Sequence, residues 1–384
     1  MTEKQPAERI PENAGDIKIS SVPDPAPLLR WYYRSRRHLP WREDPTPYHV
    51  WISEIMLQQT RVEAVKGYYA RFLGAFPDIS SLSEAEEETV LKYWEGLGYY
   101  SRARNLKKAA GEVCRLGGKM PEEKKDLMKL PGIGSYTAAA ISSIAFGREE
   151  PAVDGNLLRV FARLSLYSEN IRTQEAKNRA EAYFRAMMDR IGRNAGEDHK
   201  NPYGDLNQAL MDLGALICVP GQEADCENCP LEEACLVHRT MPGRETSLPR
   251  IPDAKPRKVE GITVFLIQSG NRTAIRKRPD RGLLSGLYEF PNTSGHLGEK
   301  EALAYVRKLG FTPLHITPLG DAQHVFSHIE WHMIGYKVRI DELDEKGYPL
   351  EGDSGKIFFA GPDEIRDRYS IPTAFRYYRE HLES

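Results

Sequence analysis

The sequence predicts a mainly α domain followed by an α+β domain. Apolar residues recur at helical spacing from Trp31 to Cys218, and no strand pattern precedes residue 240. Prolines then stand among basic residues, and β-branched and aromatic runs follow them. We therefore divide the chain into a polar leader (1–27), a helical domain (28–238), a Pro/basic linker (239–258) and an α+β domain (259–384).

The helical domain is expected to consist of successive amphipathic helices. "WISEIMLQQTRVEAVKGYYARFLGAF" has helical apolar spacing, and "SEAEEETVLKYWEGLG" has an acidic first turn and a closing glycine. "RARNLKKAAGEVCRLGG" ends at glycines, and "MPEEKKDLMKLPGIGSYTAAAISSIAFG" predicts a helix, a glycine turn and a second helix. Three further helical patterns complete the domain: "GNLLRVFARL", "TQEAKNRAEAYFRAMMDRIG" and "GDLNQALMDLGALIC".

The α+β domain begins with a predicted hairpin, formed by "GITVFLIQ" and "TAIRKR" around "SGNR". "EKEALAYVRKLGF" is expected to be a helix. "HVFSHIEWHMIGYKVRI" has strand composition and is expected to break near Ser327 and His328. A last helix is expected over "PTAFRYYREHL".

The overall charge gives no sign of nucleic-acid binding, since the 384 residues carry a formal net charge of −2. Binding to nucleic acid would therefore depend on local basic patches, and one is expected on a single helix: Arg102, Arg104, Lys107 and Lys108. No apolar run reaches the ~18 residues of a membrane span. The first twenty residues lack the apolar core of a signal peptide, so we expect a cytoplasmic protein.

The glycine turn in "LPGIGSYTAAAIS" has the form of a tight connection between two helices. Gly132 and Gly134 precede the second helix, where unpaired N–H groups and the helix dipole favour an anion. No "GKS" or "GKT" follows, which argues against a nucleoside triphosphate. A DNA phosphate is the better candidate. The simpler alternative is an ordinary helix–helix turn.

Two acidic residues stand out as candidates for chemistry. Asp154 precedes a glycine and a helix, where a carboxylate usually serves as a cap. Glu54 lies in an apolar helical stretch, where it occupies either the solvated edge or the interior. Burial would raise its pKa and let it deliver a proton near neutral pH. A proton donor facing an ionised acid suits bond cleavage through an oxocarbenium-like state, as in N-glycosidic bonds.

Seven motifs together resemble the adenine DNA glycosylases of the MutY kind, in the helix–hairpin–helix glycosylase superfamily. In order they are "LPWR" (39–42), "WISEIMLQQT" (51–60), "GLGYYSRARNL" (96–106), "LPGIGSYTAAAI" (130–141), "VDGN" (153–156), "LNQALMDLGALIC" (206–218) and "VFSH" (325–328). The resemblance covers roughly residues 28–380. It implies a helix–hairpin–helix glycosylase domain with an iron–sulfur loop, followed by a Nudix-like domain.

The resemblance implies a role for each acidic candidate. Glu54 matches the general acid that protonates adenine at N7, and Asp154 matches the residue that stabilises or briefly traps the sugar cation. Asn156 matches a residue that holds this constellation, and the turn at Gly132 and Gly134 would grip a phosphate beside the flipped nucleotide.

Tyr136 distinguishes this chain from bifunctional relatives that resemble endonuclease III, which carry a lysine at this position. That lysine forms a Schiff base and drives strand cleavage, and tyrosine cannot do so. We therefore expect a monofunctional enzyme that leaves the abasic site intact, with the Tyr136 phenol either near the reaction centre or packing the hairpin. Some members carry a lysine where this chain has Leu158, so no incidental adduct is expected.

A glycosylase must flip its target base out of the duplex. By the resemblance, Gln59 and Tyr99 form the wedge inserted beside the orphaned base, and an aromatic face suits that task. The alternative for Tyr99 is a core aromatic at a helix start. Four residues match those around the extruded adenine: Arg37, Leu39, Trp41 and Gln208.

Four of the five cysteines form the spacing Cys218-x7-Cys226-x2-Cys229-x5-Cys235. The pattern resembles the 4Fe–4S loop of the family, and four thiolates are the ligands such a cluster needs. Zinc is the rival, although zinc ribbons usually pair two C-x2-C knuckles. The first gap, "VPGQEAD", is one residue longer than the family pattern.

The C-terminal segments "RPDRGLLSGLYEFPN" and "VFSHIEWHM" resemble the Nudix-like domain of the same family. The glutamate arrangement of a working Nudix hydrolase is missing around "GEKEALAYVRKLGF", so we expect no hydrolase activity. The resemblance implies that Phe326, Ser327 and His328 recognise 8-oxoguanine. His324, His328 and His332 are spaced by four, but strands and a turn would separate them, which argues against a metal site there.

The expected function is removal of adenine mispaired with 8-oxoguanine in double-stranded DNA, and of adenine opposite guanine. The expected protein is a nucleoid-associated monomer with a 4Fe–4S cluster. A glycosylase for another mispair, such as thymine opposite guanine, is an alternative, but "VFSH" would have no use there. A non-catalytic lesion-binding protein would need neither Glu54 nor Asp154.

Overall fold

The computed structural model describes residues 22–194, 201–221, 224–252, 256–341 and 356–382. Residues 1–21 of the predicted leader lie outside this range. The chain divides into two compact units, the first made of residues 1–70 and 109–253 and the second of residues 71–108 and 254–384. The second unit thus combines the C-terminal segment with residues from the middle of the predicted helical domain.

The first unit is helical, as the sequence predicts. Its helices are α1 (Ala26–Ser35), α2 (Pro40–Glu43), α3 (Pro47–Leu57), α8 (Lys124–Leu127), α9 (Ser135–Phe146), α10 (Gly155–Leu164), α11 (Gln174–Asn194), α12 (Pro202–Leu216) and α13 (Leu236–Thr240), with 3-10 turns η2 (Glu232–Ala234) and η3 (Glu245–Ser247). Helix α4 (Val62–Ala75) begins in this unit and ends in the second, and helix α7 (Ser101–Arg115) begins in the second and ends in this one. Among the described residues, no helix has both the length and the apolarity to cross a bilayer.

Local signals fix the helices that carry the site. Thr46 caps α3 by accepting a hydrogen bond from the His49 N–H, and Pro47 occupies its first turn. Helix α9 starts after Gly134 and ends at Gly147, whose φ of 67° is the left-handed conformation of a helix C-cap. Its buried face is rich in alanine, which lets α9 pack closely against α3 and α12.

A large core holds α1, α10, α11 and α12 together. It contains the fully buried rings of Tyr32, Phe161, Tyr183 and Phe184. Cys218, Cys229 and Cys235 pack against its edge. The segment carrying the cysteines is therefore anchored on the same core that positions α10 and α12.

The second unit contains helices and a seven-stranded mixed sheet. Its helices are α5 (Ile79–Glu84), α6 (Glu87–Tyr93), α14 (Glu299–Lys308), α15 (Pro362–Asp367) and α16 (Arg376–Arg379), with a 3-10 turn η4 (Thr373–Phe375). Its strands are β1 (Lys258–Ser269), β2 (Arg272–Lys277), β3 (Tyr288–Glu289), β4 (Asn292–Ser294), β5 (Pro313–Val325), β6 (Ile329–Ile340) and β7 (Ile357–Ala360).

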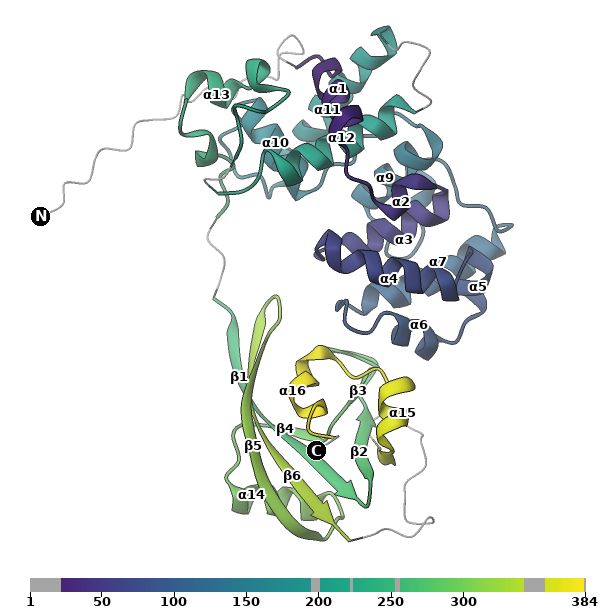
Figure 1. Cartoon of the computed structure of the whole chain (residues 1–384), viewed down its shortest axis with the longest axis vertical. Coiled ribbons are helices and arrows are strands. Elements are labelled where there is room, and N and C mark those ends of the chain that lie inside the picture. The colour runs from purple at the N-terminus through teal and green to yellow at the C-terminus, as the bar shows by residue number, and fades with distance from the viewer. Residues whose placement is uncertain (1–21, 195–200, 222–223, 253–255, 342–355, 383–384) are drawn as a thin grey trace, which may run out of the picture. The chain divides into compact units, whose positions relative to one another are not determined.

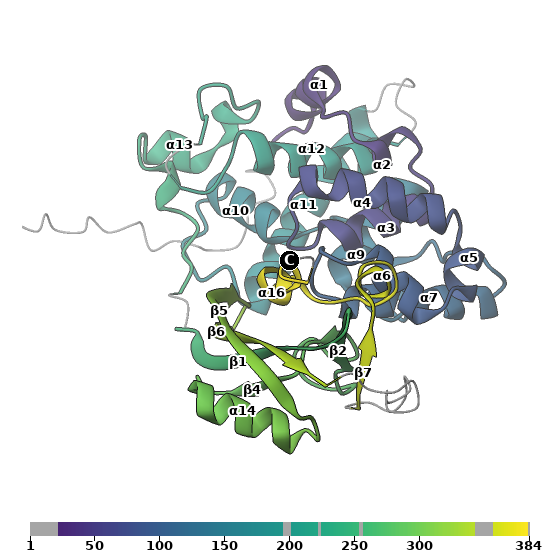
Figure 2. The same cartoon turned by 60° about the horizontal axis from the view of Figure 1, so that its bottom comes forward.

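The sheet has the order β3-β2-β1-β6-β5, with β4 paired to β1 and β7 to β2. Strands β1 and β6 are parallel, with Phe265 opposite Tyr336. Helix α14 covers one face through Ala302 and Val306, and the C-terminal helices cover the other through Ile365 and Phe375 (Figures 1 and 2). The α+β class predicted for this part of the chain is confirmed.

The predicted strands β1, β2 and β6 are confirmed, but β3, β4 and β7 were not predicted, and the start of β5 and the linker boundary differ from the prediction. The hairpin of β1 and β2 pairs Gln268 with Thr273, and the break between β5 and β6 falls at residues 326–328. Strand β5 begins at Pro313, far before the predicted start. The first part of the predicted linker packs into the first unit, since Leu248 is buried and its carbonyl accepts a hydrogen bond from Arg163 Nε at 3.0 Å.

Candidate active site

A cavity of about 190 Å³ in the first unit brings together residues from six helices and the turns between them. All eight residues predicted for catalysis or adenine contact line it: Arg37, Leu39, Trp41, Glu54, Tyr136, Asp154, Asn156 and Gln208. A single water needs only about 10–15 Å³ of such space, so the cavity admits a far larger group. Segments more than 150 residues apart in sequence therefore form one pocket.

Glu54 is an interior residue of α3 and is only 5% exposed. Burial raises the pKa of its carboxyl to about 7, and the nearby Asp154 carboxylate acts in the same direction. A hydrogen bond from Tyr136 and the charge of Arg42 oppose that rise in pKa. Near neutral pH the group is therefore divided between its acid and its carboxylate form, which is the condition for donating a proton.

Tyr136 extends from the first turn of α9 to the same carboxyl group. Its phenol O–H donates a hydrogen bond of 2.7 Å to Glu54 Oε2. Burial and the negative charges of Glu54 and Asp154 raise the Tyr136 pKa well above its usual value, so the phenol stays protonated. The tyrosine therefore does more than pack the hairpin, because it holds one oxygen of the buried acid in place.

Asp154 combines a structural contact with exposure to the cavity. As the N-cap of α10, its Oδ1 accepts a hydrogen bond of 2.8 Å from the Leu157 N–H. Its Oδ2 accepts one of 3.0 Å from Asn156 Nδ2. Burial raises the pKa of the Asp154 carboxyl, and these hydrogen bonds and the charge of Arg159 oppose the rise. The helix-cap interpretation and the catalytic one are thus compatible.

Arg159 was missed by the sequence analysis, yet it orients Asn156. Its Nη1 donates to Asn156 Oδ1 at 3.1 Å, and its Nε donates to the carbonyl oxygen of Cys218 at 2.9 Å. A side chain at Gly214 would place its Cβ 3.2 Å from that of Asn156, so the glycine lets α12 lie close to α10. An arginine in the middle of the apolar stretch "GNLLRVFARL" was the signal available in the sequence.

The adenine-contact candidates differ in how they are held. Leu39 and Trp41 are almost fully buried and form an apolar part of the cavity wall. Arg37 Nε instead donates a hydrogen bond of 2.7 Å to Asp212 Oδ1. Arg42 grips the same carboxylate through Nη1 and Nη2, at 2.8 and 3.0 Å.

Asp212 is completely buried, and burial alone would raise its pKa, but hydrogen bonds and charge from Arg42 and Arg37 lower the pKa below its usual value. The two arginines and Asp212 therefore form an ionised cluster at the wall of the cavity. The sequence analysis missed Asp212 and Arg42. A charge inside the apolar run "ALMDLGAL" was the available signal, because a buried carboxylate requires a cationic partner.

The glycine turn and the wedge candidates are not among the residues that line this cavity. Gly132 has a φ of 77°, which glycine adopts without strain, and Gly134 caps the N-terminus of α9. Gln59 and Tyr99 have φ values of 57° and 46°, a region that few non-glycine residues occupy. Strain of this kind is common at functional positions.

Tyr99 is 48% exposed, so the core-aromatic alternative for it is wrong. Within the second unit its hydroxyl lies 2.9 Å from Ser327 Oγ, close enough for a hydrogen bond. Ser327 and His328 are exposed between β5 and β6, while the ring of Phe326 packs edge-on against Trp331. One wedge candidate and the predicted lesion-sensing residues are thus adjacent.

The predicted basic patch on α7 is wrong in part. Arg102 is only 8% exposed, and it donates hydrogen bonds to the carbonyl groups of Leu97 and Gly98. Arg104 pairs with Glu87 and donates to the Ser285 carbonyl at 2.7 Å. These two arginines stabilise local structure instead of forming a solvated cationic surface.

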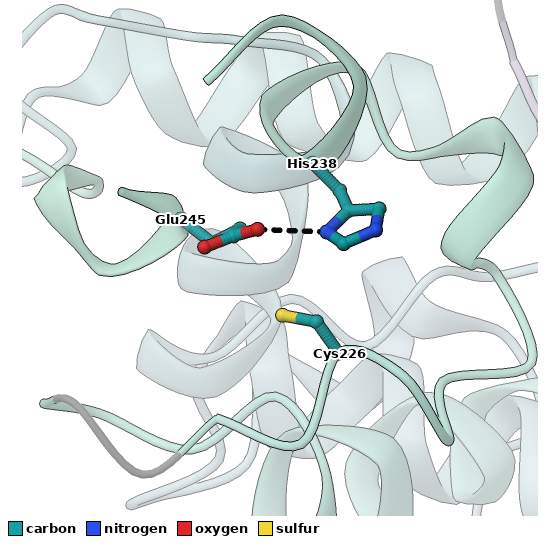
Figure 3. Close-up of side chains that lie close together, drawn as sticks. All are labelled: Cys226, His238 and Glu245. Atoms are coloured by element: carbon teal, nitrogen blue, oxygen red, sulfur yellow. Dashed lines mark hydrogen bonds and ion pairs between the residues drawn. The ribbon is translucent and has the colours of Figure 1, made fainter. Parts of the chain in front are cut away.

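The four cysteines of the predicted cluster line one small cavity of about 30 Å³, between α10, α12 and α13. Burial is the main cause that raises the thiol pKa of Cys226 to about 11 and of Cys229 to about 12, and the neighbouring thiols add to it. Arg163 Nη1 lies 3.2 Å from Cys218 Sγ. Four cysteine sulfurs that line one cavity beside an arginine are a donor set that fits a metal cluster. His238 and Glu245 lie beside Cys226 in the same cavity (Figure 3).

Two domain families match this chain. Residues 52–186 match the HhH-GPD superfamily of base excision DNA repair proteins, and residues 263–381 match the NUDIX domain. The adenine DNA glycosylase of Rattus norvegicus is 33% identical, over 92% of this chain and 77% of that protein. The adenine DNA glycosylase of Buchnera aphidicola subsp. Baizongia pistaciae is also 33% identical, over 79% of this chain and 82% of that protein. A solved thermostable thymine-DNA glycosylase is 29% identical over 56% of this chain and 94% of its own, with a TM-score of 0.47.

Proposed function

We propose, from the premise that this chain belongs to the adenine DNA glycosylase family, that it removes adenine from 8-oxoguanine–adenine mispairs without cutting the strand. Membership of the family makes it a base-excision repair glycosylase with a helix–hairpin–helix and a Nudix-like domain. The choice of mispair, the monofunctional chemistry and the cofactor are the parts we infer.

One observation carries the chemical proposal: a buried carboxyl with a pKa of about 7 and a second carboxyl line one cavity. Glu54 as an acid donates its proton to N7 of an everted adenine. Protonation makes the base a better leaving group, so the C1′–N9 bond breaks and its electron pair stays with adenine. Tyr136 holds the Glu54 carboxyl in position through its hydrogen bond.

Asp154 supplies the opposite charge that the sugar needs as the bond breaks. An oxocarbenium-like sugar is stabilised by a carboxylate at close range in a site from which most water is excluded. The Leu157 N–H and the Asn156 amide fix both oxygens of Asp154. Water then adds at C1′ and gives its proton to a carboxylate of the cavity, which completes hydrolysis.

Three features support a monofunctional reaction. The residue beside Glu54 is Tyr136, and a protonated phenol cannot form a Schiff base with the sugar aldehyde. Leu158 is buried in α10 and carries no amine. Among the residues that line the cavity there is no lysine. The abasic strand is therefore left intact.

The second unit is proposed to recognise 8-oxoguanine. Ser327 lies exposed at the turn between β5 and β6, with an hydroxyl able to donate to or accept from a base edge. Its contact with Tyr99 links the sensing loop to a wedge residue. Phe326 is anchored by Trp331, which holds the loop in place.

A 4Fe–4S cluster is proposed as the resident cofactor. Cys218, Cys226, Cys229 and Cys235 would hold it, and its role would be to fix the loop that follows α12. Arg159 contacts the Cys218 carbonyl, so the loop also supports the residue that orients Asn156. We further propose that the protein acts as a monomer on DNA in the cytoplasm, at the nucleoid.

The direct test is a base-release assay with the purified full chain. Four duplexes are compared, with adenine opposite 8-oxoguanine, guanine or thymine, and with thymine opposite guanine. We expect free adenine, fastest opposite 8-oxoguanine, and strand breakage only after alkali. Release of thymine would support the rival mispair specificity, and lesion binding without base release would make the protein non-catalytic.

A further inference from the structure

We propose that Cys226, His238 and Glu245 form a mononuclear zinc site, used when the four-cysteine cluster is not assembled. This inference goes beyond the proposed glycosylase activity and does not depend on it. Cys226 belongs to both ligand sets, so zinc and the cluster exclude each other. The segment between α12 and the second unit could then be held by either of two metal centres.

The geometry of the three side chains is that of a metal site before closure. Their sulfur, nitrogen and oxygen donor atoms all lie within 4.8 Å of one another (Figure 3). His238 extends from α13, Glu245 from η3, and Cys226 from the loop between them and α12. Zinc bonds of about 2.0–2.3 Å place tetrahedral ligand atoms roughly 3.3–3.7 Å apart. Small side-chain rotations are enough to reach those separations.

The surroundings of His238 match those of a metal-ligating histidine. Its Nδ1 points at Glu245 Oε1, 2.7 Å away, where a metal would replace the proton of their hydrogen bond. Its Nε2 donates to Glu232 Oε1 at 3.2 Å. A ligating histidine usually donates its second N–H to a carboxylate, which fixes the ring and strengthens it as a ligand.

Charge also favours the mixed set for a single divalent ion. One thiolate and one carboxylate neutralise Zn²⁺, whereas four thiolates leave two negative charges in a largely buried pocket, of which Arg163 beside Cys218 offsets one. Burying net charge is costly, and the side chains of His238 and Glu245 are only 26% and 13% exposed. A thiolate, an imidazole and a carboxylate together suit zinc better than calcium or magnesium.

The test uses the full-length chain, with iron removed anaerobically by a chelator and then loaded with one equivalent of zinc. X-ray absorption at the zinc edge gives the ligand atoms directly. We expect one sulfur at about 2.3 Å and lighter atoms at about 2.0–2.2 Å. Four sulfurs, or no retained zinc, would overturn the proposal.

Variants separate the two ligand sets by zinc affinity, measured by competition with a chromogenic chelator. His238→Ala should weaken zinc binding by more than about 100-fold, since even an outer-shell partner is worth about 10–100-fold. Cys218→Ser, which removes a cluster ligand outside the mixed set, should leave zinc affinity nearly unchanged. If Cys218→Ser weakens zinc binding strongly and His238→Ala does not, zinc occupies a four-thiolate site, and the proposal is contradicted.

Discussion

Replacing Tyr136 with phenylalanine should shift the pH dependence of adenine release toward higher pH. The change removes only the O–H that donates to Glu54 Oε2. That hydrogen bond favours the ionised carboxylate, so it lowers the Glu54 pKa, which nevertheless stands at about 7 because of burial. Without the bond, Glu54 should hold its proton to higher pH.

The size of the shift follows from the strength of the bond. A hydrogen bond to a charged group contributes about 1.5–3 kcal/mol, and one pKa unit corresponds to about 1.4 kcal/mol. The Glu54 pKa should therefore rise by about one to two units, from about 7 in the unmodified chain. Because the acid form is the active one, the rate falls as the pH rises above this pKa. In the variant, the pH at which the rate falls should rise by the same amount, about one to two units.

The assay is single-turnover release of adenine from an 8-oxoguanine–adenine duplex across neutral and alkaline pH. Glu54→Gln is the control, since its residual rate should show no alkaline limb from this group. A limb that stays in place in Tyr136→Phe, or moves to lower pH, would refute the assignment of Glu54 as the buried acid held by Tyr136.

Three further outcomes follow from the same contacts. Glu54→Gln should raise the free energy of unfolding at pH 8 by up to about 3 kcal/mol, measured by urea unfolding. Because the pKa of Glu54 is raised, its contribution to the stability of the unmodified chain is full below the ordinary pKa of 4.5 and is lost as pH rises through about 7. The gain in the variant should therefore vanish near pH 4.5. Asp212→Asn should lower the free energy of unfolding by about 3 kcal/mol or more, because it leaves Arg42 and Arg37 without their buried partner. The loss should be the same at pH 6 and pH 8, since the lowered pKa of Asp212 keeps its carboxyl ionised across that range. Ser327→Ala should reduce the preference for 8-oxoguanine over guanine opposite adenine by about tenfold, the value of one hydrogen bond, with little change in the guanine–adenine rate itself.

The helical half of the chain was predictable because its signals are local. Helix α10 shows the case well, since Asp154 and the apolar spacing after it determine the cap and the buried face. The hairpin of β1 and β2 was predictable for the same reason. The resemblance to a family then assigned distant motifs, such as "LPWR" and "LNQALMDLGALIC", to one site.

Other features depend on tertiary contacts that a local pattern does not contain. Strand β5 is polar and contains Pro313 and Pro318; it lies at the sheet edge, where no side chain needs full burial and prolines are tolerated. The sequence predicted Arg102 as part of a basic surface, but its guanidinium is buried because it donates hydrogen bonds to the carbonyl groups of Leu97 and Gly98. Glu54 could have been a solvated residue, and only the packing around α3 makes it an acid with a raised pKa.

The central claim, that Glu54 delivers the proton that releases adenine, is tested most directly by comparing the full chain with Glu54→Gln in single-turnover adenine release. Glutamine keeps the size of the side chain but has no acidic proton. Loss of a general acid costs about 10²–10⁴-fold, so we expect a rate lowered within that range while the duplex still binds. A Glu54→Gln enzyme that releases adenine at a rate close to that of the unmodified chain would contradict the account.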